Sequence, residues 1–244
     1  MKLLSFALWG AAARYTVGAV RNAELAPAVY PGWVCRFYCG TSVPAATLRA
    51  LADLPHVQVV AVPEPGDWRG LFWRFGPAGE DDVEVMLSRD TDSRLGARER
   101  AAVDAWLASD RDFHVMRDHP LHGTSILGGL WGVRGSCLRD IDALVATYPR
   151  SDAYDVDQRF LEEVVAPRVR DRWLEHDGYF AGKPFPTRRA GREFVGQPFD
   201  EHDRPLIEGP SWLEERFAAM RFRRGPVVRL ARGARRLVRR AWGG

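Results

Sequence analysis

The alternation of apolar strand patterns with helix patterns constrains the fold of this chain more than any other feature. Leu3–Trp9, Trp33–Cys39 and Val57–Val62 are short apolar or aromatic runs, which are typical of buried strands. A helix pattern over residues 16–28, with Asn22 on its exposed side, separates the first two runs, and a second helix pattern separates the next two. A β-α-β-α-β order implies a parallel sheet with right-handed crossovers. We therefore predict an α/β fold with a mostly parallel, Rossmann-like sheet flanked by helices.

The chain has 244 residues and a net charge of +3, and its charges are unevenly distributed. Residues 221–244 carry nine Arg and no acidic residue, whereas the remainder has 26 basic and 32 acidic residues. A body with an acidic balance argues against nucleic-acid binding, which uses a basic face. We expect one catalytic domain over residues 1–205 and a C-terminal extension over residues 206–244.

The N-terminal segment Met1–Ala13 imitates a signal peptide, with one Lys, a short apolar run and small residues. A single Lys is little positive charge for the N-terminal region of a signal peptide, however, and Trp9 and Gly10 fit poorly before a cleavage site. We therefore favour a first buried strand. The sparse cysteines favour reduced thiols in a cytoplasmic protein. No stretch reaches the ~18 apolar residues that a transmembrane helix needs.

The segment Asp82–Arg94 contains a fourth apolar run that ends in two carboxylates, Asp90 and Asp92. In an extended chain, residues i and i+2 project to the same side, so the two carboxylates can face one point. Open α/β sheets bind ligands beyond the carboxyl ends of their strands, and Mg²⁺ uses one or two carboxylates together with substrate phosphates. One interpretation is therefore a Mg²⁺ or Mn²⁺ site for a phosphorylated substrate. The other is a polar loop whose Asp side chains cap the helix that begins near Gly96.

Two later segments carry further candidates. Gly128 and Gly129 share an apolar run with Trp131; glycine lets a substrate approach the backbone closely, and the indole offers a flat apolar wall. This run lacks the arrangement of a dinucleotide site. Asp157 and Gln158 lie in the first turn of a predicted helix, where the helix dipole favours carboxylates regardless of function.

Four motifs follow one another along the chain. They are Arg-Asp-Thr-Asp-Ser-Arg (89–94), Gly-Gly-Leu-Trp-Gly (128–132), Asp-Gln-Arg-Phe-Leu (157–161) and His176. This order resembles the GT-A-fold nucleotide-sugar glycosyltransferases, and family 8 most closely, although that family has Asn-Ser-Gly where this chain has residues 128–130. Over residues 1–204 the chain also resembles uncharacterised glycosyltransferase-like proteins of bacterial surface-polysaccharide loci.

The resemblance implies roles for several of these residues. In such enzymes the Asp-x-Asp motif holds Mn²⁺ or Mg²⁺ against the donor diphosphate, which implies Asp90 and Asp92 as metal ligands. Asp92 is the first choice for direct metal contact, whereas Asp90 can instead contact the ribose or sugar of the donor. The family pattern further implies that Asp157 and Gln158 are catalytic residues near the donor sugar, and that His176 completes the metal shell.

Five basic residues are candidates for donor binding. The resemblance implies that Lys183 meets donor phosphate, although the spacing around it departs from the family pattern. Arg89 and Arg94 bracket the Asp-x-Asp motif and could add charge-assisted contacts to the same phosphates. Arg14, after the first strand, and Arg74, in the aromatic segment before the fourth strand, complete this set.

The implied reaction breaks a sugar–phosphate bond, and a bound metal would stabilise the departing nucleoside diphosphate as a Lewis acid. Asp157 is the candidate carboxylate near the sugar, where it positions a hydroxyl or stabilises an oxocarbenium-like centre. An inverting enzyme also needs a general base, for which Asp157 and Asp118 are candidates; a retaining enzyme does not.

Residues 226–242 place apolar side chains on one helical face and six Arg on the other, as in a basic amphipathic helix that lies in a membrane interface. At roughly 1 kcal/mol per basic residue near an anionic surface, this helix could hold the protein there. A disordered tail, or a helix packed on the acidic body, is the alternative.

We therefore predict a metal-dependent, hexosyltransferase-like enzyme at the cytoplasmic face of a membrane. It would move a sugar from a nucleotide-sugar donor to a saccharide or lipid-linked saccharide acceptor in surface-polysaccharide synthesis. One alternative is a non-catalytic, membrane-peripheral, glycosyltransferase-like binding protein. Another is an Asp-x-Asp phosphohydrolase. Two features argue against this class: the motif follows the fourth strand, and Ser93 stands where a Thr is expected after the second Asp.

Overall fold

A seven-stranded mixed sheet forms the centre of the protein in the computed structural model, which describes residues 1–149, 151 and 153–210. The strands are β1 (Lys2–Leu8), β2 (Val34–Cys39), β3 (Val57–Ala61), β4 (Val85–Ser88), β5 (Phe113–Arg117), β6 (Trp131–Arg134) and β7 (Trp173–Asp177). Their order in space is β3-β2-β1-β4-β6-β5-β7, and in this sheet only β6 runs antiparallel to its neighbours. The predicted α/β class with a mostly parallel, Rossmann-like sheet is confirmed.

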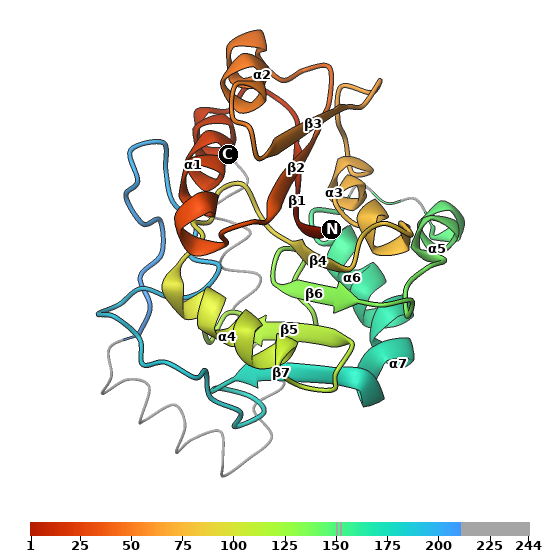
Figure 1. The fold of residues 1–244 in the computed structure, drawn as a ribbon, viewed down its shortest axis with the longest axis vertical. Coiled ribbons are helices and arrows are strands. Elements are labelled where there is room, and N and C mark those ends of the chain that lie inside the picture. Colours follow the sequence, from red (N-terminus) through yellow and green to blue (C-terminus); the bar gives the residue numbers. More distant parts are fainter. Residues whose placement is uncertain (150, 152, 211–244) are drawn as a thin grey trace.

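Helices cover both faces of the sheet (Figure 1). They are α1 (Ala13–Val29), α2 (Ala45–Ala52), α3 (Gly70–Trp73), α4 (Ala97–Leu107), α5 (Ile141–Thr147), α6 (Val156–Phe160) and α7 (Ala166–Val169). Of three hydrophobic clusters, one lies between the sheet and α1, α2 and α4, and another lies between the sheet and α3, α5, α6 and α7; a smaller third includes Met116 of β5 and Leu130. A π-helical turn over Leu161–Val165 joins α6 to α7.

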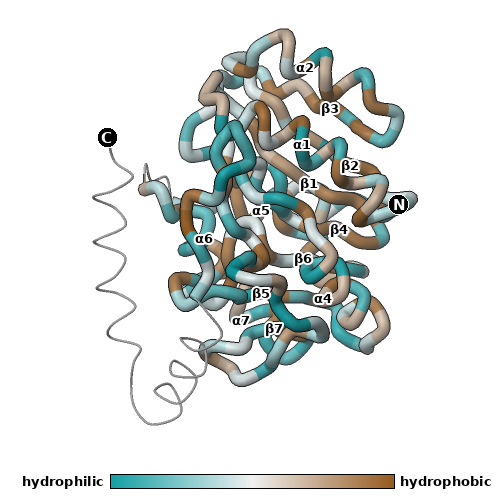
Figure 2. The backbone as a smooth tube through the Cα atoms, turned by 90° about the vertical axis from the view of Figure 1, so that its left-hand side faces the viewer, coloured by the Kyte–Doolittle hydropathy of each residue, from teal (hydrophilic) through white to brown (hydrophobic). Residues whose placement is uncertain are grey.

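The side-chain alternation of the central strand β1 explains why both faces need helices. Leu4, Phe6 and Leu8 enter the core beneath α1, whereas Leu3 enters the opposite core. Successive residues of a strand point to opposite faces, and a strand that is apolar on both faces must be covered on both to remove that surface from water. Figure 2 shows hydrophobic stretches along the inner strands and hydrophilic stretches on the surrounding segments.

The strand order reverses at β1, which creates a ligand-binding edge between β1 and β4. The chain moves outward from β1 to β2 and β3 and then returns to β4 on the other side of β1. In open α/β sheets, ligands bind beyond the carboxyl ends of the strands at such a switch point. Because β6 runs antiparallel to β4, with Trp131 paired to Ser88, the residues before β6 reach the same edge as the residues after β4.

One local expectation is wrong, because Asn22 is fully buried rather than exposed on α1. Its side chain donates hydrogen bonds to the carbonyls of Thr91 and Ser93, at 3.2 and 2.8 Å, and accepts one from the backbone N–H of Leu95 at 3.0 Å. A buried amide needs such partners, but they lie about 70 positions away and leave no local sequence signal. Asn22 therefore ties α1 to the loop that follows β4.

Among the described residues, no helix is long and apolar enough to cross a membrane. The predicted basic amphipathic helix over residues 226–242 lies outside the described residues.

Candidate active site

Three charged side chains meet at the carboxyl edge of β4, where the guanidinium group of Arg74 lies between the carboxylates of Asp90 and Asp157. Arg74 Nη1 is 2.7 Å from Asp90 Oδ1, and Arg74 Nη2 is 3.0 Å from Asp157 Oδ2. Arg74 follows α3, Asp90 follows β4, and Asp157 lies in the first turn of α6. Arg74 and Asp157 are buried, whereas the side chain of Asp90 is 43% exposed. The fold thus brings together three predicted site residues and leaves one carboxylate open to solvent.

The loop after β4 is a hydrogen-bonded turn rather than the extended segment that we expected. Ser93 Oγ donates to the carbonyl of Asp90 at 3.0 Å, and the backbone N–H of Phe199 donates to the carbonyl of Asp92 at 2.8 Å. The side chain of Asp92 faces Arg14, with 3.6 Å between Oδ2 and Nε. The two carboxylates are therefore neighbours because the chain turns, and strand alternation is the wrong reason for their proximity.

Gly128 and Gly129 lie against this cluster, and neither position has room for a side chain. A Cβ at Gly128 would lie 2.2 Å from Asp157 Oδ2, and a Cβ at Gly129 would lie 2.1 Å from Asp90 Oδ2. Ser88 Oγ, at the end of β4, donates to the carbonyl of Gly128 at 2.7 Å and fixes the segment in place. We predicted that a substrate would approach the backbone closely at these glycines. In the structure, the carboxylates of Asp157 and Asp90 make that close approach.

Burial dominates the electrostatics of the acidic side chains. It raises the pKa of Asp157 to about 6, although the charge of Arg74 opposes this. Burial and the neighbouring charge of Asp90 raise the pKa of Asp92 to about 6, although Arg14 opposes this. Opposite charge beside a carboxylate favours its ionised form and like charge disfavours it. Asp90 and Asp92 therefore repel each other, and a bound cation would relieve that repulsion.

Gln158 supports Asp157 from the next position of α6. The backbone N–H of Gln158 donates to Asp157 Oδ1 at 2.8 Å, which orients the carboxylate. The side-chain Oε1 of Gln158 accepts a hydrogen bond from Thr124 Oγ1 at 3.4 Å. Gln158 thus lies beside the cluster, and its contacts among the described residues are positioning contacts.

Asp90 and Asp92 suit a hard divalent cation only together with ligands from a substrate. Within the part of the chain that the structure describes, no group of three His, Cys, Asp or Glu side chains could hold a metal ion. His176 lies on β7, three strands from β4, which is about 14 Å at the usual strand spacing. Its Nδ1 lies 2.8 Å from Nε2 of His114, and burial lowers the pKa of His176 to about 4. The structure does not bring His176 to the aspartates, contrary to its predicted place in the metal shell.

Arg89 and Trp131 lie in the interior, so this structure does not place Arg89 at a donor phosphate or Trp131 as a wall for the substrate. Both side chains are fully buried. Asp90 turns toward α3, and its neighbour Arg89 therefore points to the opposite face, where its Nε donates to Glu99 at 2.7 Å. Trp131 stacks on Phe113 with ring centroids 5.3 Å apart. The sequence pattern identified a strand end at Arg89 and an apolar run at Trp131, but not the face to which each side chain points.

Asp118 is held by two arginines and is a poor candidate for the general base. Arg98 donates two hydrogen bonds of 2.8 Å to its carboxylate, and Arg189 donates another of 3.0 Å. Burial alone would raise the pKa of Asp118, but these donors and the backbone N–H of Val195 outweigh it and lower the pKa. A carboxylate with a lowered pKa accepts a proton less readily. Asp118 instead anchors the segment that contains Arg189 and Val195.

Arg94 and Lys183, both predicted to bind donor phosphate, are engaged elsewhere. Arg94 Nε donates to Asp203 Oδ1 at 2.9 Å, and its guanidinium lies 5.3 Å from the ring centroid of Phe199. Lys183 forms an ion pair of 3.0 Å with Glu175 on β7. Arg94 therefore holds the segment around Phe199 against the Asp-x-Asp loop, and Lys183 lies at the far edge of the sheet.

Two tyrosines that the sequence reasoning did not select interact electrostatically with the site carboxylates. Burial raises the pKa of Tyr15, and the charge of Asp92 adds to this effect. Tyr154 is 77% exposed and lies within electrostatic reach of Asp90 and Asp92. An exposed aromatic ring can offer a stacking surface to a ligand. No local pattern marks either tyrosine, because their proximity depends on how α1 and the segment before α6 meet.

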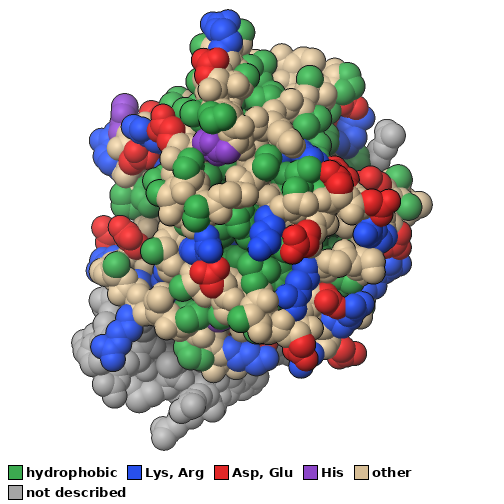
Figure 3. All heavy atoms as spheres, in the orientation of Figure 1, with side chains coloured by type: hydrophobic (Ala, Val, Ile, Leu, Met, Phe, Trp, Pro, Cys, Tyr) green, Lys and Arg blue, Asp and Glu red, His purple; other side chains and the backbone are tan. Residues whose placement is uncertain are grey.

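Acidic and basic side chains are interspersed on the face shown in Figure 3. Many arginines are paired with carboxylates, as in the exposed pairs Arg69–Asp67 and Arg100–Asp104. Exposed pairs of this kind contribute little to stability. A buried cation such as Arg74, which is 7% exposed, has a stronger electrostatic effect on a ligand beside it.

No family model and no curated protein matches the chain. Several solved glycosyltransferase structures have similar folds. The galactosyltransferase LgtC, in complex with donor and acceptor sugar analogues, is 15% identical with a TM-score of 0.44, and 74% of each chain is covered. The mannosyltransferase PcManGT from Pyrobaculum calidifontis, in complex with GDP-Man and Mn²⁺, is 13% identical with a TM-score of 0.49, covering 71% of this chain and 54% of that one.

A further similar structure is glucosyl-3-phosphoglycerate synthase from Mycobacterium tuberculosis in complex with Mn²⁺, UDP-glucose and phosphoglyceric acid. It is 14% identical with a TM-score of 0.46, covering 72% of this chain and 68% of that one. At such identities the likeness concerns the fold alone.

Proposed function

We propose that this protein is a divalent-metal-dependent glycosyltransferase. It moves a sugar from a nucleotide-sugar donor to a saccharide or lipid-linked saccharide acceptor in surface-polysaccharide synthesis. The observation that carries the proposal is the Arg74 guanidinium between Asp90 and Asp157 at the switch point of the sheet. A buried cation, an exposed carboxylate and a buried carboxylate at one edge suit a ligand that carries both phosphates and hydroxyls.

Asp90 and Asp92 are the proposed protein ligands of Mg²⁺ or Mn²⁺, with donor phosphate oxygens completing the shell. Such a cation, when bound, supplies Lewis-acid stabilisation of the departing nucleoside diphosphate. Arg14, at 3.6 Å from Asp92, lies where it can add a charge-assisted contact to the same diphosphate. The negative charge that develops on the departing diphosphate would thus be stabilised from two sides, by the cation and by Arg14.

Asp157 and Arg74 are the proposed residues for the donor sugar. Arg74 fixes the Asp157 carboxylate from one side, and the backbone N–H of Gln158 fixes it from the other. A carboxylate held in this way can orient a sugar hydroxyl or stabilise positive charge at the reacting carbon. Gly128 and Gly129 keep side chains out of the space beside both carboxylates.

A membrane-associated acceptor is the part of the proposal that rests on sequence alone. Residues 226–242 have the pattern of a basic amphipathic helix, which suits the anionic inner face of a membrane. A lipid-linked saccharide would then be presented at the surface on which the enzyme lies. Cytoplasmic localisation follows from the same arrangement, because nucleotide-sugar donors and anionic lipids meet on that side.

The proposal is tested by thermal unfolding with UDP, GDP, ADP, CDP and dTDP in the presence of Mn²⁺. A nucleotide at ~100 times its Kd should stabilise the protein by about 2.7 kcal/mol, or roughly 5–10 °C for a chain of this size. Asp92→Asn should remove this stabilisation, because one of the two metal carboxylates is lost. Asp110→Asn is the matched control, since the Asp110 side chain is 89% exposed and, among the described residues, pairs with Arg111 alone.

Two outcomes contradict the proposal. If no nucleotide raises the unfolding temperature with Mn²⁺ or Mg²⁺, the protein does not bind a nucleotide-sugar donor at this site. If nucleotides stabilise Asp92→Asn as much as the native chain, the metal assignment is wrong even though a nucleotide binds.

A further inference from the structure

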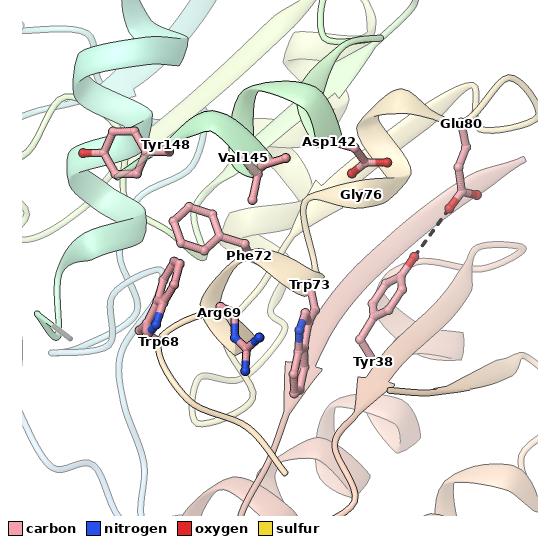
Figure 4. Close-up of a pocket in the computed structure, with 11 residues that line it drawn as sticks. Tyr38, Trp68, Arg69, Phe72, Trp73, Gly76, Glu80, Asp142, Val145 and Tyr148 are labelled. Atoms are coloured by element: carbon pink, nitrogen blue, oxygen red, sulfur yellow. Dashed lines mark hydrogen bonds between the residues drawn. The ribbon is translucent and has the colours of Figure 1, made fainter. Parts of the chain in front are cut away.

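A groove of about 510 Å³ lies beside the candidate active site, and five aromatic side chains line it (Figure 4). They are Tyr38, Trp68, Phe72, Trp73 and Tyr148. Tyr38 comes from β2, the next three from α3 and the segment before it, and Tyr148 from the end of α5. This volume lies within the range of cavities that bind small molecules.

The groove is separate from the proposed donor site but shares its walls. Its lining contains none of Arg74, Asp90, Asp92 and Asp157. Trp73 directly precedes Arg74, however, and the α5 side of the groove leads through a short connection into α6, where Asp157 lies. Phe72 packs edge-on against Phe160 of α6, with ring centroids 5.4 Å apart. A molecule in the groove would thus lie against α3, which directly precedes Arg74.

The groove also carries polar groups. Within the part of the chain that the structure describes, the indole N–H groups of Trp68 and Trp73 donate no hydrogen bond to the protein. The carboxylate of Asp142, which is exposed on α5, likewise has no ion pair there. Glu80, in contrast, is held by Arg36 at 2.6 Å. The groove therefore offers ring faces together with donors and an acceptor that a ligand could satisfy.

We infer that this groove binds a neutral saccharide chain, the acceptor of the proposed transferase. A sugar ring presents C–H groups on its faces and hydroxyls around its edge, so it can pack on an aromatic ring while its hydroxyls reach neighbouring polar groups. Hydroxyls would accept from the two indole N–H groups and donate to Asp142, which makes the last contact charge-assisted. The acceptor role rests on the proposed function, whereas the binding of a saccharide does not.

The same polar groups disfavour an apolar occupant. A lipid chain or an apolar helix in the groove would cover the indole N–H groups of Trp68 and Trp73 and the Asp142 carboxylate without offering them partners. Burying polar groups without hydrogen bonds is unfavourable, and burying a carboxylate unpaired is more so. A saccharide satisfies these groups and still covers the rings.

Calorimetric titration of the full chain with maltohexaose, isomaltohexaose, cellohexaose and chitohexaose, each to about 10 mM, tests the inference without any nucleotide. At least one hexasaccharide should bind. Trp68→Ala should weaken that binding about 5- to 10-fold, because a ring contact of this size is lost. Trp73→Phe, which keeps a ring but removes the N–H, and Asp142→Asn should each weaken it about threefold.

Trp173→Ala is the matched control, because Trp173 is a partly buried tryptophan on β7, outside the groove. It should leave saccharide affinity unchanged. If no hexasaccharide binds, or if the three groove variants bind as tightly as the native chain, the inference is overturned. The nucleotide-dependent stabilisation measured on the same variants separates the two proposals. If nucleotides bind and saccharides do not, only the groove inference is overturned. If saccharides bind and nucleotides do not, only the donor-site proposal is overturned.

Discussion

The lack of a side chain at Gly129 allows the segment before β6 to lie directly against Asp90. A Cβ at this position would lie 2.1 Å from Asp90 Oδ2 and 2.8 Å from the Asp90 backbone nitrogen, so Gly129→Ala must displace the carboxylate or the loop that carries it. Displacement of about 1 Å commonly costs on the order of 100-fold in rate. We expect Gly129→Ala to lower transferase turnover by about that factor, measured as release of nucleoside diphosphate from the donor.

Gly178→Ala is the control for this substitution, because a Cβ there would meet no atom within 4 Å. It should retain native turnover and native unfolding temperature. Native turnover in Gly129→Ala, with the protein folded, would show that Asp90 is not held at this distance during the reaction.

Residues of the site differ in how far the sequence could identify them. Asp90 and Asp157 are recognisable because each stands at an element boundary within a motif, and the structure brings both to Arg74. Arg89 has equally favourable chemistry for a phosphate, but it is adjacent to Asp90 and therefore points to the opposite face of the sheet. Asn22 was predicted to be exposed because an amide gains its importance from distant backbone partners, which the local pattern does not show.

At the scale of elements, the buried arginine Arg89 joins β4 to two helices. Its Nε donates to Glu99 of α4, and the hydroxyl of Tyr30, at the end of α1, donates to the same carboxylate oxygen, both at 2.7 Å. Removing one partner of a buried ion pair leaves an uncompensated charge, which costs about 3–5 kcal/mol. We expect Arg89→Met to lower the free energy of unfolding in urea by that amount.

The triple variant Arg89→Met/Glu99→Leu/Tyr30→Phe should recover part of this loss, because the three polar side chains are replaced by apolar groups of similar size, while the carbonyls of Ser88 and Trp131 still lose Arg89 as a donor. It should also retain nucleotide-dependent stabilisation, since none of the three side chains faces the site. Loss of nucleotide binding in this variant, with its stability partly restored, would reinstate Arg89 as a donor-binding residue.

The elements themselves were predictable where a periodic pattern lay within one segment. The first three strands and the helices between them follow from apolar spacing and turn residues, and so does the parallel pairing of β1 with β2 and of β2 with β3. The reversal of β6 does not follow, because strand direction depends on the connections around it and not on the residues within it. Yet that reversal is what places Gly128 and Gly129 at the carboxyl edge of β4.

At the scale of the whole molecule, the sheet separates two tasks. One face of the sheet is occupied by α1, α2 and α4. The core on that face includes Trp106 and Tyr30 and shares no residue with the lining of the aromatic groove. The other face carries α3, α5 and α6, which supply Arg74, Asp157 and most of the groove. The switch point joins both faces at one edge, so the proposed donor and acceptor sites can share α3 while the α1 face holds the loop of Asp90 and Asp92.

The sequence pattern of residues 226–242 predicts a property that the described fold does not supply, which is a preference for an anionic surface. Residues 226–242 contain six Arg, which helical spacing would place opposite an apolar face. At roughly 1 kcal/mol per basic residue, six arginines would bind a negatively charged bilayer firmly, and the apolar face would add to this by partial burial. We expect the full chain to float with vesicles that contain phosphatidylglycerol, and a chain that ends before Arg221 to remain at the bottom of the gradient.

Salt and lipid composition distinguish this mechanism from unspecific adhesion. Because the Debye length falls to about 3 Å at 1 M salt, high salt should weaken flotation of the full chain, and vesicles of phosphatidylcholine alone should bind it poorly. The shortened chain should keep its nucleotide-dependent stabilisation, since all residues of the proposed donor site precede the cut. Undiminished flotation without the tail would mean that the body itself contacts the membrane, and an acceptor presented by lipid would then have to reach the site by a different face of the molecule.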